Sequence, residues 1–124
     1  MKNLKRILVC DDDPNQLKFY TKILGQFKLT NGFKLFDDGK PLVEELKNSN
    51  YSDQETLIIS DFYMPYKGLY VFKDAKELGF NKIIIRSSAS KISLQEKLKS
   101  QVEIMSKFDP DSYLIEKILE FDLY

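Results

Sequence analysis

The sequence predicts an α/β domain in which short buried strands alternate with amphipathic helices. Mostly apolar runs of four to six residues recur five times along the 124 residues, and helical spacing of apolar residues follows each run. Five strand–helix units joined by right-handed crossovers place helices on both faces of a parallel sheet, and the chain is too short for an eight-unit barrel. We therefore expect one domain over residues 1–124, a flavodoxin-like doubly wound five-stranded parallel sheet of order 2-1-3-4-5 with five helices.

Each expected strand is a short apolar run that ends at polar or turn-forming residues. The first and third runs end at aspartates, and the second follows Gly32 and ends at Asp37-Asp38-Gly39. The fourth contains Ile83-Ile84-Ile85, which is apolar enough to lie inside a sheet covered on both faces. In chain order, the expected strands are Ile7–Cys10, Phe33–Phe36, Thr56–Ser60, Lys82–Ser87 and Val102–Ser106.

The helices are predicted from capping residues together with apolar residues at helical spacing. Asp13 before Pro14 is typical of an N-cap and a first-turn proline, Pro41 opens the second helix, and Gly79 ends the third. The expected helices are Pro14 to Phe27, one that opens at Pro41, one that carries Leu69 to Leu78, a weaker one from Ser90 to Ser100, and one that begins at Asp111 or Ser112.

The composition excludes several classes of function. Nineteen basic and nineteen acidic residues cancel without long runs of either sign, so we expect neither a nucleic-acid nor a membrane partner. The absence of histidine excludes an imidazole base and any zinc site that needs this ligand. Cys10 is alone, and we expect a small buried filler rather than a redox sensor. With no membrane-spanning run and no signal segment, we expect a soluble cytoplasmic protein.

Carboxylates follow two strands that should be neighbours in this sheet. Asp11, Asp12 and Asp13 come directly after the first strand, and Asp61 follows the third. The doubly wound order has its switch point between these strands, where such folds bind ligands. Two carboxylates about 4 Å apart repel by about 4 kcal/mol at an effective dielectric constant of about 20, so the cluster needs a cation or a shared proton. Few oxygen ligands with room for water and phosphate favour Mg²⁺.

A phosphoryl group could be transferred at such a site. A lone carboxylate beside a magnesium ion can attack phosphorus and form an aspartyl phosphate. Ser87 or Ser88, after the fourth strand, could donate a hydroxyl, and strand alternation favours Ser87. Lys107, after the fifth strand, could pair with the phosphoryl group. Asp13 is better interpreted as a helix cap than as a ligand.

These residues resemble the receiver domain of two-component response regulators, of the single-domain kind that includes chemotaxis regulators. The resemblance covers essentially the whole chain and implies Asp61 as phospho-acceptor, Ser87 as switch hydroxyl and Lys107 as the site lysine. It also implies magnesium ligation by Asp12, by Asp11 through water, by Asp61 and by the backbone carbonyl of Tyr63. The residues that carry it are Ile7 to Pro14, Asp61-Phe62-Tyr63-Met64-Pro65, Gly68, Ser87 and Lys107.

The resemblance also implies partners and a mode of action. The phosphoryl group would come from a sensor histidine kinase or a histidine phosphotransfer protein, and Asp61 would undergo magnesium-dependent self-phosphorylation and autodephosphorylation without conventional turnover. The output would pass to a downstream protein or along a relay, since we expect no effector domain. A homodimer through the face of the fourth helix, fifth strand and last helix is also implied as an option.

The sequence departs from the receiver pattern at three places. The loop Met64 to Gly68 is one residue shorter than usual, the usual Lys-Pro pair is Lys107-Phe108, and Met105 stands where receivers carry an aromatic switch residue. Two alternatives stay open, the first because of Phe108 and Met105 and the second because Asp11 and Asp13 form an Asp-x-Asp pattern after a strand. One is a degenerate receiver that acts as a phosphorylation-independent interaction module. The other is a phosphatase of the haloacid dehalogenase type that uses Asp11 and Asp13, which leaves Asp61 without a role.

Overall fold

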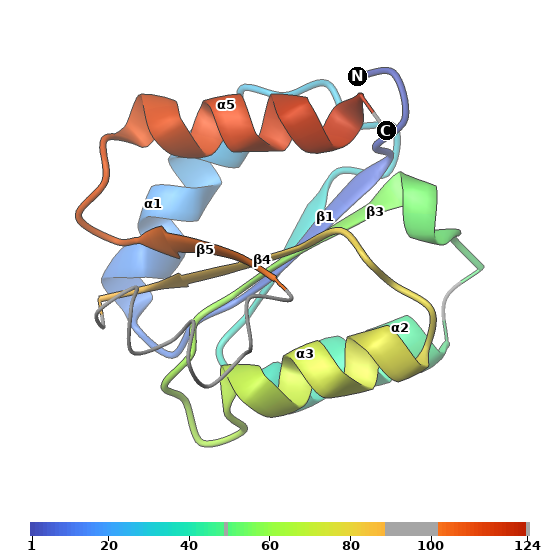
Figure 1. Ribbon diagram of the computed structural model, residues 1–124. Helices are drawn as coiled ribbons and strands as arrows, with labels where there is room; N and C mark the ends of the chain where they lie inside the picture. Colours follow the sequence, from blue (N-terminus) through green and yellow to red (C-terminus); the bar gives the residue numbers. More distant parts are fainter. Residues whose placement is uncertain (49, 89–101, 124) are drawn as a thin grey trace.

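The fold is a parallel sheet of five strands between two layers of helices (Figure 1). The computed structural model describes residues 1–48, 50–88 and 102–123. The strand order β2-β1-β3-β4-β5 confirms the predicted doubly wound topology. The strands are β1 (Arg6–Cys10), β2 (Phe33–Phe36), β3 (Thr56–Ser60), β4 (Ile83–Ser87) and β5 (Glu103–Ser106).

The helices of the described residues lie on both faces of the sheet, α1 and α5 on one and α2 and α3 on the other (Figure 1). Their bounds are α1 (Pro14–Leu24), α2 (Gly39–Lys47), α3 (Gly68–Glu77) and α5 (Asp111–Asp122), with a 3₁₀ turn η1 (Asp53–Glu55) before β3. The helix expected from Ser90 to Ser100 lies outside the described residues. None of the described helices is both long and apolar enough to cross a membrane.

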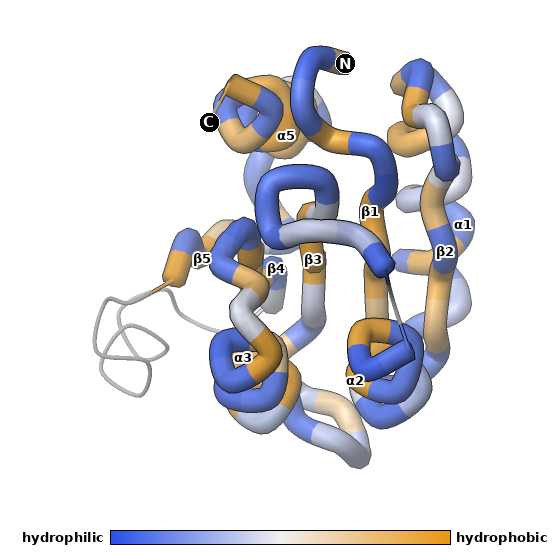
Figure 2. The backbone as a smooth tube through the Cα atoms, turned by 90° about the vertical axis from the view of Figure 1, so that its right-hand side faces the viewer, coloured by the Kyte–Doolittle hydropathy of each residue, from blue (hydrophilic) through white to orange (hydrophobic). Residues whose placement is uncertain are grey.

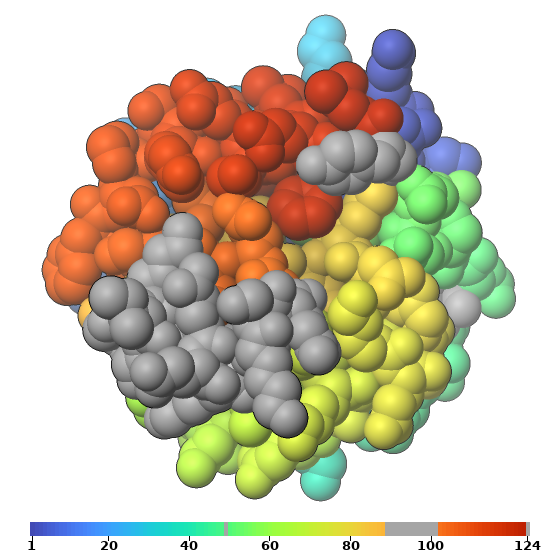
Figure 3. All heavy atoms as spheres, in the orientation of Figure 1, coloured from blue at the N-terminus to red at the C-terminus, as the bar shows by residue number. Residues whose placement is uncertain are grey.

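The central strands bury their side chains on both faces, as the apolar runs predicted. Every residue of β1, β3 and β4 is buried, and Figure 2 shows the apolar stretches of β1 and β3 between the helical layers. One apolar cluster joins Leu8, Ile58 and Ile85 to α2 and α3, and the other joins Val9, Ile59 and Met105 to α1 and α5. On the face shown in Figure 3, atoms of α3 and α5 are both exposed.

Two predicted helix boundaries were wrong. Helix α1 ends at Leu24 rather than Phe27, because the next backbone groups close three-residue turns, with Phe27 N donating to Leu24 O at 3.1 Å. Helix α2 begins at Gly39, two residues before Pro41. A Cβ on Gly39 would lie 2.3 Å from Val71 Cγ2, so the close approach of α2 to α3 requires a glycine there.

The two ends of the described chain are joined by one carboxylate. The side chain of Asp122, at the end of α5, accepts hydrogen bonds from the backbone N–H groups of Lys2 (2.6 Å), Asn3 (2.8 Å) and Leu4 (2.7 Å). Burial alone would raise the pKa of Asp122, but these backbone hydrogen bonds outweigh it and lower the pKa below its ordinary value. The charged form of Asp122 therefore stabilises the folded chain.

Replacing Asp122 with asparagine tests this contribution. We expect Asp122→Asn to lower the free energy of unfolding by roughly 2 kcal/mol at neutral pH, since the amide has one acceptor oxygen fewer and its remaining hydrogen bonds lose the charge of the acceptor. Because the folded-state pKa lies below the unfolded value of about 3.9, the wild-type advantage is present above that value and is lost as the pH falls through the folded pKa. Urea unfolding of both proteins between neutral and acidic pH measures the difference between their free energies of unfolding. A difference that does not shrink in acid would contradict the assignment.

Candidate functional site

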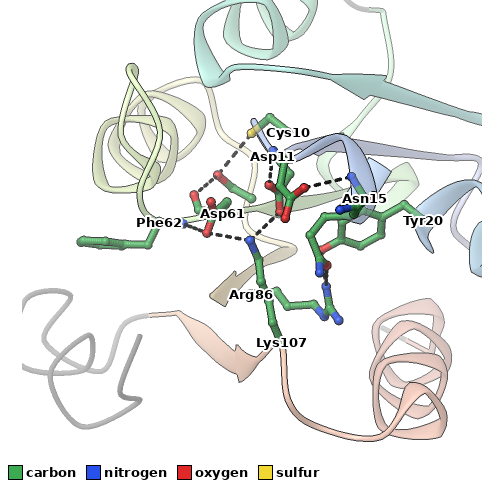
Figure 4. A network of polar contacts seen from close by, with 11 residues as sticks. Cys10, Asp11, Asn15, Tyr20, Asp61, Phe62, Arg86 and Lys107 are labelled. Carbon is green, nitrogen blue, oxygen red and sulfur yellow. Dashed lines mark hydrogen bonds and ion pairs between the residues drawn. The ribbon is translucent and has the colours of Figure 1, made fainter. Parts of the chain in front are cut away.

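Three carboxylates meet at the carboxyl end of the sheet. Ligand atoms of Asp11, Asp12 and Asp61 all lie within 4.8 Å of one another. Strands β1 and β3 are paired with Cys10 opposite Ser60, and Asp61 N donates to Cys10 O at 2.9 Å, so the residues that follow each strand start at the same level. The structure thus brings together the acids that the strand order predicted to converge, and Figure 4 shows Asp11 and Asp61 side by side.

The acids differ in exposure and in the contacts that hold them. Asp11 is fully buried and Asp61 is 6% exposed, whereas Asp12 is exposed. Asp11 Oδ1 accepts a hydrogen bond from Asp13 N at 2.9 Å, and Asp61 Oδ1 accepts one from Phe62 N at 2.8 Å. Backbone amides therefore fix one oxygen of each buried carboxylate and leave the other oxygen for a ligand.

Lys107 brings a positive charge to the buried acids. Its Nζ lies 2.8 Å from Asp11 Oδ2 and 3.4 Å from Asp61 Oδ1, and its side chain is 11% exposed. The backbone of Lys107 is attached to the tip of β4, because its N–H donates to Ser87 O at 2.9 Å. The fourth and fifth strands thus deliver Ser87 and Lys107 to the edge of the sheet where the acids lie.

A turn after β5 fixes the direction in which Lys107 leaves the strand. Ser106 N donates to Asp109 Oδ2 at 3.0 Å, and Phe108 N donates to Ser106 Oγ at 3.0 Å. The Lys107–Phe108 peptide bond is trans, and Phe108 is 82% exposed. The side chains of Ser106 and Asp109 therefore fix the turn that follows Lys107.

The acid cluster fits a hard divalent cation. Asp11 Oδ2 is buried and receives no hydrogen bond within the described part of the chain, so the Lys107 ammonium offers it charge at 2.8 Å but not a well-aligned donor. A buried carboxylate oxygen without a donor is costly. Three carboxylates with an open, exposed side at Asp12 match the oxygen ligands that Mg²⁺ takes while keeping several waters.

Electrostatics at Asp61 favour the same cation. Burial raises the pKa of the Asp61 carboxyl, and the charge of Asp11 raises it further, while Lys107 and the Phe62 N–H oppose the shift. The charged form of Asp61 is therefore destabilised in the metal-free site. A bound divalent cation would remove this penalty, because it is the largest local charge and opposite in sign.

The two serines after the fourth strand occupy different environments. Ser87, the last residue of β4, is 1% exposed, whereas Ser88 is exposed. The buried residue is the one that the alternation of the strand favoured. The carbonyl of Ser87 binds the backbone of Lys107, which places both residues at one strand tip. Their roles in phosphoryl transfer stay predictions.

Two further sequence interpretations are confirmed by contacts. Asp13 caps α1, since its Oδ1 accepts a hydrogen bond from Asn15 N at 2.9 Å, and it lies outside the cluster of Asp11, Asp12 and Asp61. Cys10 is fully buried with its Sγ 3.2 Å from Ser60 Oγ, and burial raises its pKa to about 12. A thiol with so high a pKa is unreactive, as expected of a buried filler.

The short loop after Asp61 is held by residues that the sequence did not single out for this purpose. Asp38, interpreted as a turn residue, accepts a hydrogen bond from Tyr66 N at 2.8 Å through its Oδ1, and the Tyr66 hydroxyl donates to Asp74. Tyr63 is 49% exposed next to the buried Phe62. The ligand role of the Tyr63 carbonyl stays a prediction. Contacts between residues so distant in sequence leave no signal in spacing or composition.

Gly68 lets α3 begin directly beneath the backbone of Asp61. A Cβ on Gly68 would lie 2.3 Å from Asp61 O and 2.7 Å from Phe62 Cα, and Gly68 N donates to Phe62 O at 2.8 Å. These atoms belong to the backbone and cannot rotate away, so any side chain here displaces Asp61. The close approach explains the requirement for glycine at this position.

We expect Gly68→Ala to destabilise the fold and disturb the acid cluster together. The added methyl group should cost about 1–3 kcal/mol of unfolding free energy, as overpacking of a tight contact does. Gly32 provides a matched control because it is far from the site and a Cβ there has nothing within 4 Å, although its φ of +67° makes alanine strained. Urea unfolding and magnesium titration of both variants measure the effect. A Gly68→Ala protein with wild-type magnesium affinity would contradict the link to Asp61.

The similarity of this chain to known proteins lies in its fold. No protein-family model matches the chain, and no curated protein matches it significantly. Solved structures are similar over nearly the whole chain. The receiver domain of a Francisella response regulator is 24% identical with a TM-score of 0.78 and covers 96% of this chain and 97% of its own.

Two further structures give the same result. A response regulator receiver protein from Sinorhizobium medicae WSM419 is 20% identical with a TM-score of 0.81 and covers 97% of this chain and 95% of its own. The BeF3-activated receiver domain of DrrB is 20% identical with a TM-score of 0.78 and covers 98% of this chain and 99% of its own. At these identities the similarity is one of fold.

Proposed function

We propose that this chain, which has the fold of response regulator receiver domains, accepts a phosphoryl group on Asp61 from a phosphohistidine donor in the presence of Mg²⁺. The proposal rests on one observation: ligand atoms of Asp11, Asp12 and Asp61 lie within 4.8 Å of one another, and Lys107 Nζ lies 3.4 Å from Asp61 Oδ1. Asp11, Asp12, Asp61 and the backbone carbonyl of Tyr63 would hold the metal. When bound, Mg²⁺ neutralises carboxylate and phosphoryl oxygens.

The residues around Asp61 suit it to act as a nucleophile. Its Oδ1 is held by Phe62 N–H at 2.8 Å and faces Lys107, which leaves the other oxygen to attack phosphorus. The bond from this oxygen to phosphorus forms as the bond from phosphorus to the donor's histidine nitrogen breaks, and that nitrogen keeps the electron pair. Lys107 is close enough to pair with a phosphoryl oxygen, and the Ser87 hydroxyl is the proposed further donor.

The output of this receiver would pass through protein contacts. We propose a sensor histidine kinase or a histidine phosphotransfer protein as donor and a downstream protein or relay as recipient. Tyr113 (42%) and Leu119 (46%) on α5, with Leu123 (68%) directly after it, are exposed apolar side chains that a protein partner could cover. The proposed surface of a homodimer combines β5 and α5 with the helix expected from Ser90 to Ser100, which lies outside the described residues.

A degenerate receiver is the second candidate, and one observation favours it. Met105, at the position of the aromatic switch residue, is 2% exposed and packs in the apolar cluster of α1 and α5. A methionine buried in this way has no ring that could move between an inner and an outer position. The acid site can therefore be intact while the coupling between phosphorylation and the surface at β5 is changed. The phosphatase alternative loses its support because Asp13 caps α1 instead of joining the acids.

Labelling with a small phosphodonor separates these functions. Acetyl phosphate and Mg²⁺ should phosphorylate the protein at Asp61, as located by mass spectrometry, and Asp61→Asn should abolish the label. Labelling at Asp11 with turnover of phosphate esters would instead indicate the phosphatase. An unlabelled wild-type protein that binds Mg²⁺ would indicate the degenerate receiver. Because Glu45 is an acid remote from the site that pairs with Lys34, Glu45→Gln serves as the control that keeps the label.

We expect Asp12→Ala to abolish magnesium binding in the millimolar range. Asp12 is the exposed acid of the cluster, so its loss removes a ligand without leaving a buried cavity. The measurement is a magnesium titration followed by amide chemical shifts. Glu45→Gln is the control, because it removes a carboxylate that is remote from the site and pairs with Lys34. Equal magnesium affinity in Asp12→Ala and wild type would reject the ligand assignment.

A further inference from the structure

Arg86 is a buried cation immediately before Ser87 in β4. Arg86 is 4% exposed, and its Nη1 donates to Gln16 Oε1 at 2.7 Å and to Tyr20 Oη at 3.2 Å. Its guanidinium carbon lies 4.5 Å from the centroid of the Phe19 ring. All three contacts are on α1, and Figure 4 shows Arg86 extending toward Tyr20.

This arrangement is energetically demanding. Within the described residues no carboxylate forms an ion pair with Arg86, and its charge is balanced by an amide oxygen, a hydroxyl and the faces of two aromatic rings, those of Phe19 and Tyr20. Removing a charge from water costs several kcal/mol, and an apolar side chain of similar volume is often equally stable in such a place. Stability of the core alone therefore does not account for an arginine among the isoleucines of β4.

The contacts of Arg86 lead directly to the loop that carries the acids. Gln16 lies in the first turn of α1, and its backbone N–H donates to Asp13 O at 3.0 Å. Asp13 N donates in turn to Asp11 Oδ1 at 2.9 Å. At the other end, the carbonyl of Ser87 binds Lys107. Arg86 thus connects the β4 tip with the loop of Asp11 to Asp13.

Of the three acids, Asp12 depends most on the contacts between Arg86 and the first turn of α1. Asp11 and Asp61 are each fixed by a backbone amide, whereas the side chain of Asp12 is exposed and makes no hydrogen bond to the part of the chain that is described. Its position is therefore set by the backbone between Asp11 and the α1 cap at Asp13. A shift of the first turn of α1 relative to β4 would move Asp12 away from the other two carboxylates.

We propose that Arg86 is a positioning residue of the metal site, which holds the first turn of α1 against β4 and so keeps Asp12 in ligating position. This inference rests on the proposed magnesium-dependent function. Groups behind the ligands of a metal typically change its affinity 10- to 100-fold when they are removed. Because Arg86 acts through two intervening residues, we expect an effect near the lower end, about tenfold.

The test compares Arg86→Met with Arg6→Met. Arg6 is a matched control, since it is 5% exposed, donates through Nε to Thr56 Oγ1 at 2.9 Å and lies 4.5 Å from the Tyr51 ring, but it begins β1 at the opposite end of the sheet. We expect Arg86→Met to weaken magnesium binding about tenfold and to change the acetyl phosphate labelling rate at saturating magnesium less than about twofold. Arg6→Met should change the unfolding midpoint and leave magnesium affinity as in wild type.

Two further variants keep the inference testable whatever Arg86→Met does to folding. Gln16→Leu removes the acceptor on α1 and leaves Arg86 in place, so it should weaken magnesium binding in the same direction. The lysine of Arg86→Lys can still reach one acceptor, so this variant should bind magnesium more tightly than Arg86→Met does. Magnesium affinity equal to wild type in Gln16→Leu, or equal losses in Arg86→Met and Arg6→Met, would overturn the inference. A wild-type protein that does not bind magnesium would instead overturn the proposed function.

Discussion

Asp61→Asn should remove phosphoryl labelling completely and, in metal-free buffer, unfold at a higher urea concentration than wild type. Burial and the charge of Asp11 raise the pKa of Asp61, so its charged form opposes folding at neutral pH. The amide keeps the shape and the acceptor for Phe62 N–H but carries no charge. We expect a gain of about 1 kcal/mol, the range in which removal of a functional strain stabilises proteins.

The sign of the pH dependence provides an independent check of this gain. Since the folded-state pKa of Asp61 is raised, wild type binds a proton more readily when folded, and its stability deficit relative to Asp61→Asn should vanish as the pH falls through that pKa. Asp122→Asn should show the opposite sign, because the folded-state pKa of Asp122 is lowered. Urea unfolding of the three proteins across the acid range measures both trends. A less stable Asp61→Asn protein at neutral pH would contradict the electrostatic account.

Magnesium should reverse the order of stability. A cation that binds the folded site raises the free energy of unfolding of wild type by mass action, whereas Asp61→Asn has lost a ligand and gains less. The difference between the free energies of unfolding of the two proteins is therefore expected to change sign at saturating magnesium. This result would show that the same carboxylate charges destabilise the metal-free site and bind the metal.

The strand order and the place of the acids could be predicted because both follow from local patterns. Apolar runs such as Ile83-Ile84-Ile85 identify central strands without reference to other parts of the chain, and a parallel order brings their carboxyl ends to one edge. Asp11 and Asp61 come directly after such runs, so their convergence follows from topology alone. The cap at Asp13 was likewise visible in the adjacent Pro14.

The supporting contacts could not be predicted because they join residues that only the fold brings together. Asp38 binds Tyr66 across 28 positions, and Arg86 reaches Gln16 across 70. Nothing in the strand pattern indicates that an arginine before Ser87 is buried against α1 rather than exposed at the strand end. The early start of α2 has the same origin, since Gly39 is required by the approach of Val71. Local signals thus locate the reacting groups, and tertiary packing decides how they are held.

Replacing Lys107 with methionine should separate the two roles of its charge. Lys107 Nζ lies 2.8 Å from Oδ2 of the buried Asp11, and removal of one partner of a buried ion pair typically costs 3–5 kcal/mol. We expect about 3 kcal/mol here, because the lysine side chain is partly exposed. With saturating Mg²⁺ much of this loss should be recovered, since the metal replaces the missing charge. Urea unfolding with and without Mg²⁺ measures both effects.

The same variant should bind magnesium more tightly and yet be labelled more slowly. The ammonium that competes with the metal for Asp11 is gone, so the magnesium affinity should rise, whereas the loss of a donor to the phosphoryl oxygens should lower the labelling rate about 100-fold. Lys117 offers a matched control because its ion pairs with Glu103 (3.2 Å) and Glu120 (3.1 Å) lie on the surface. Lys117→Met should change stability by less than about 1 kcal/mol and leave labelling unchanged. Magnesium affinity that falls in Lys107→Met would show that the lysine organises the acids rather than competing for them.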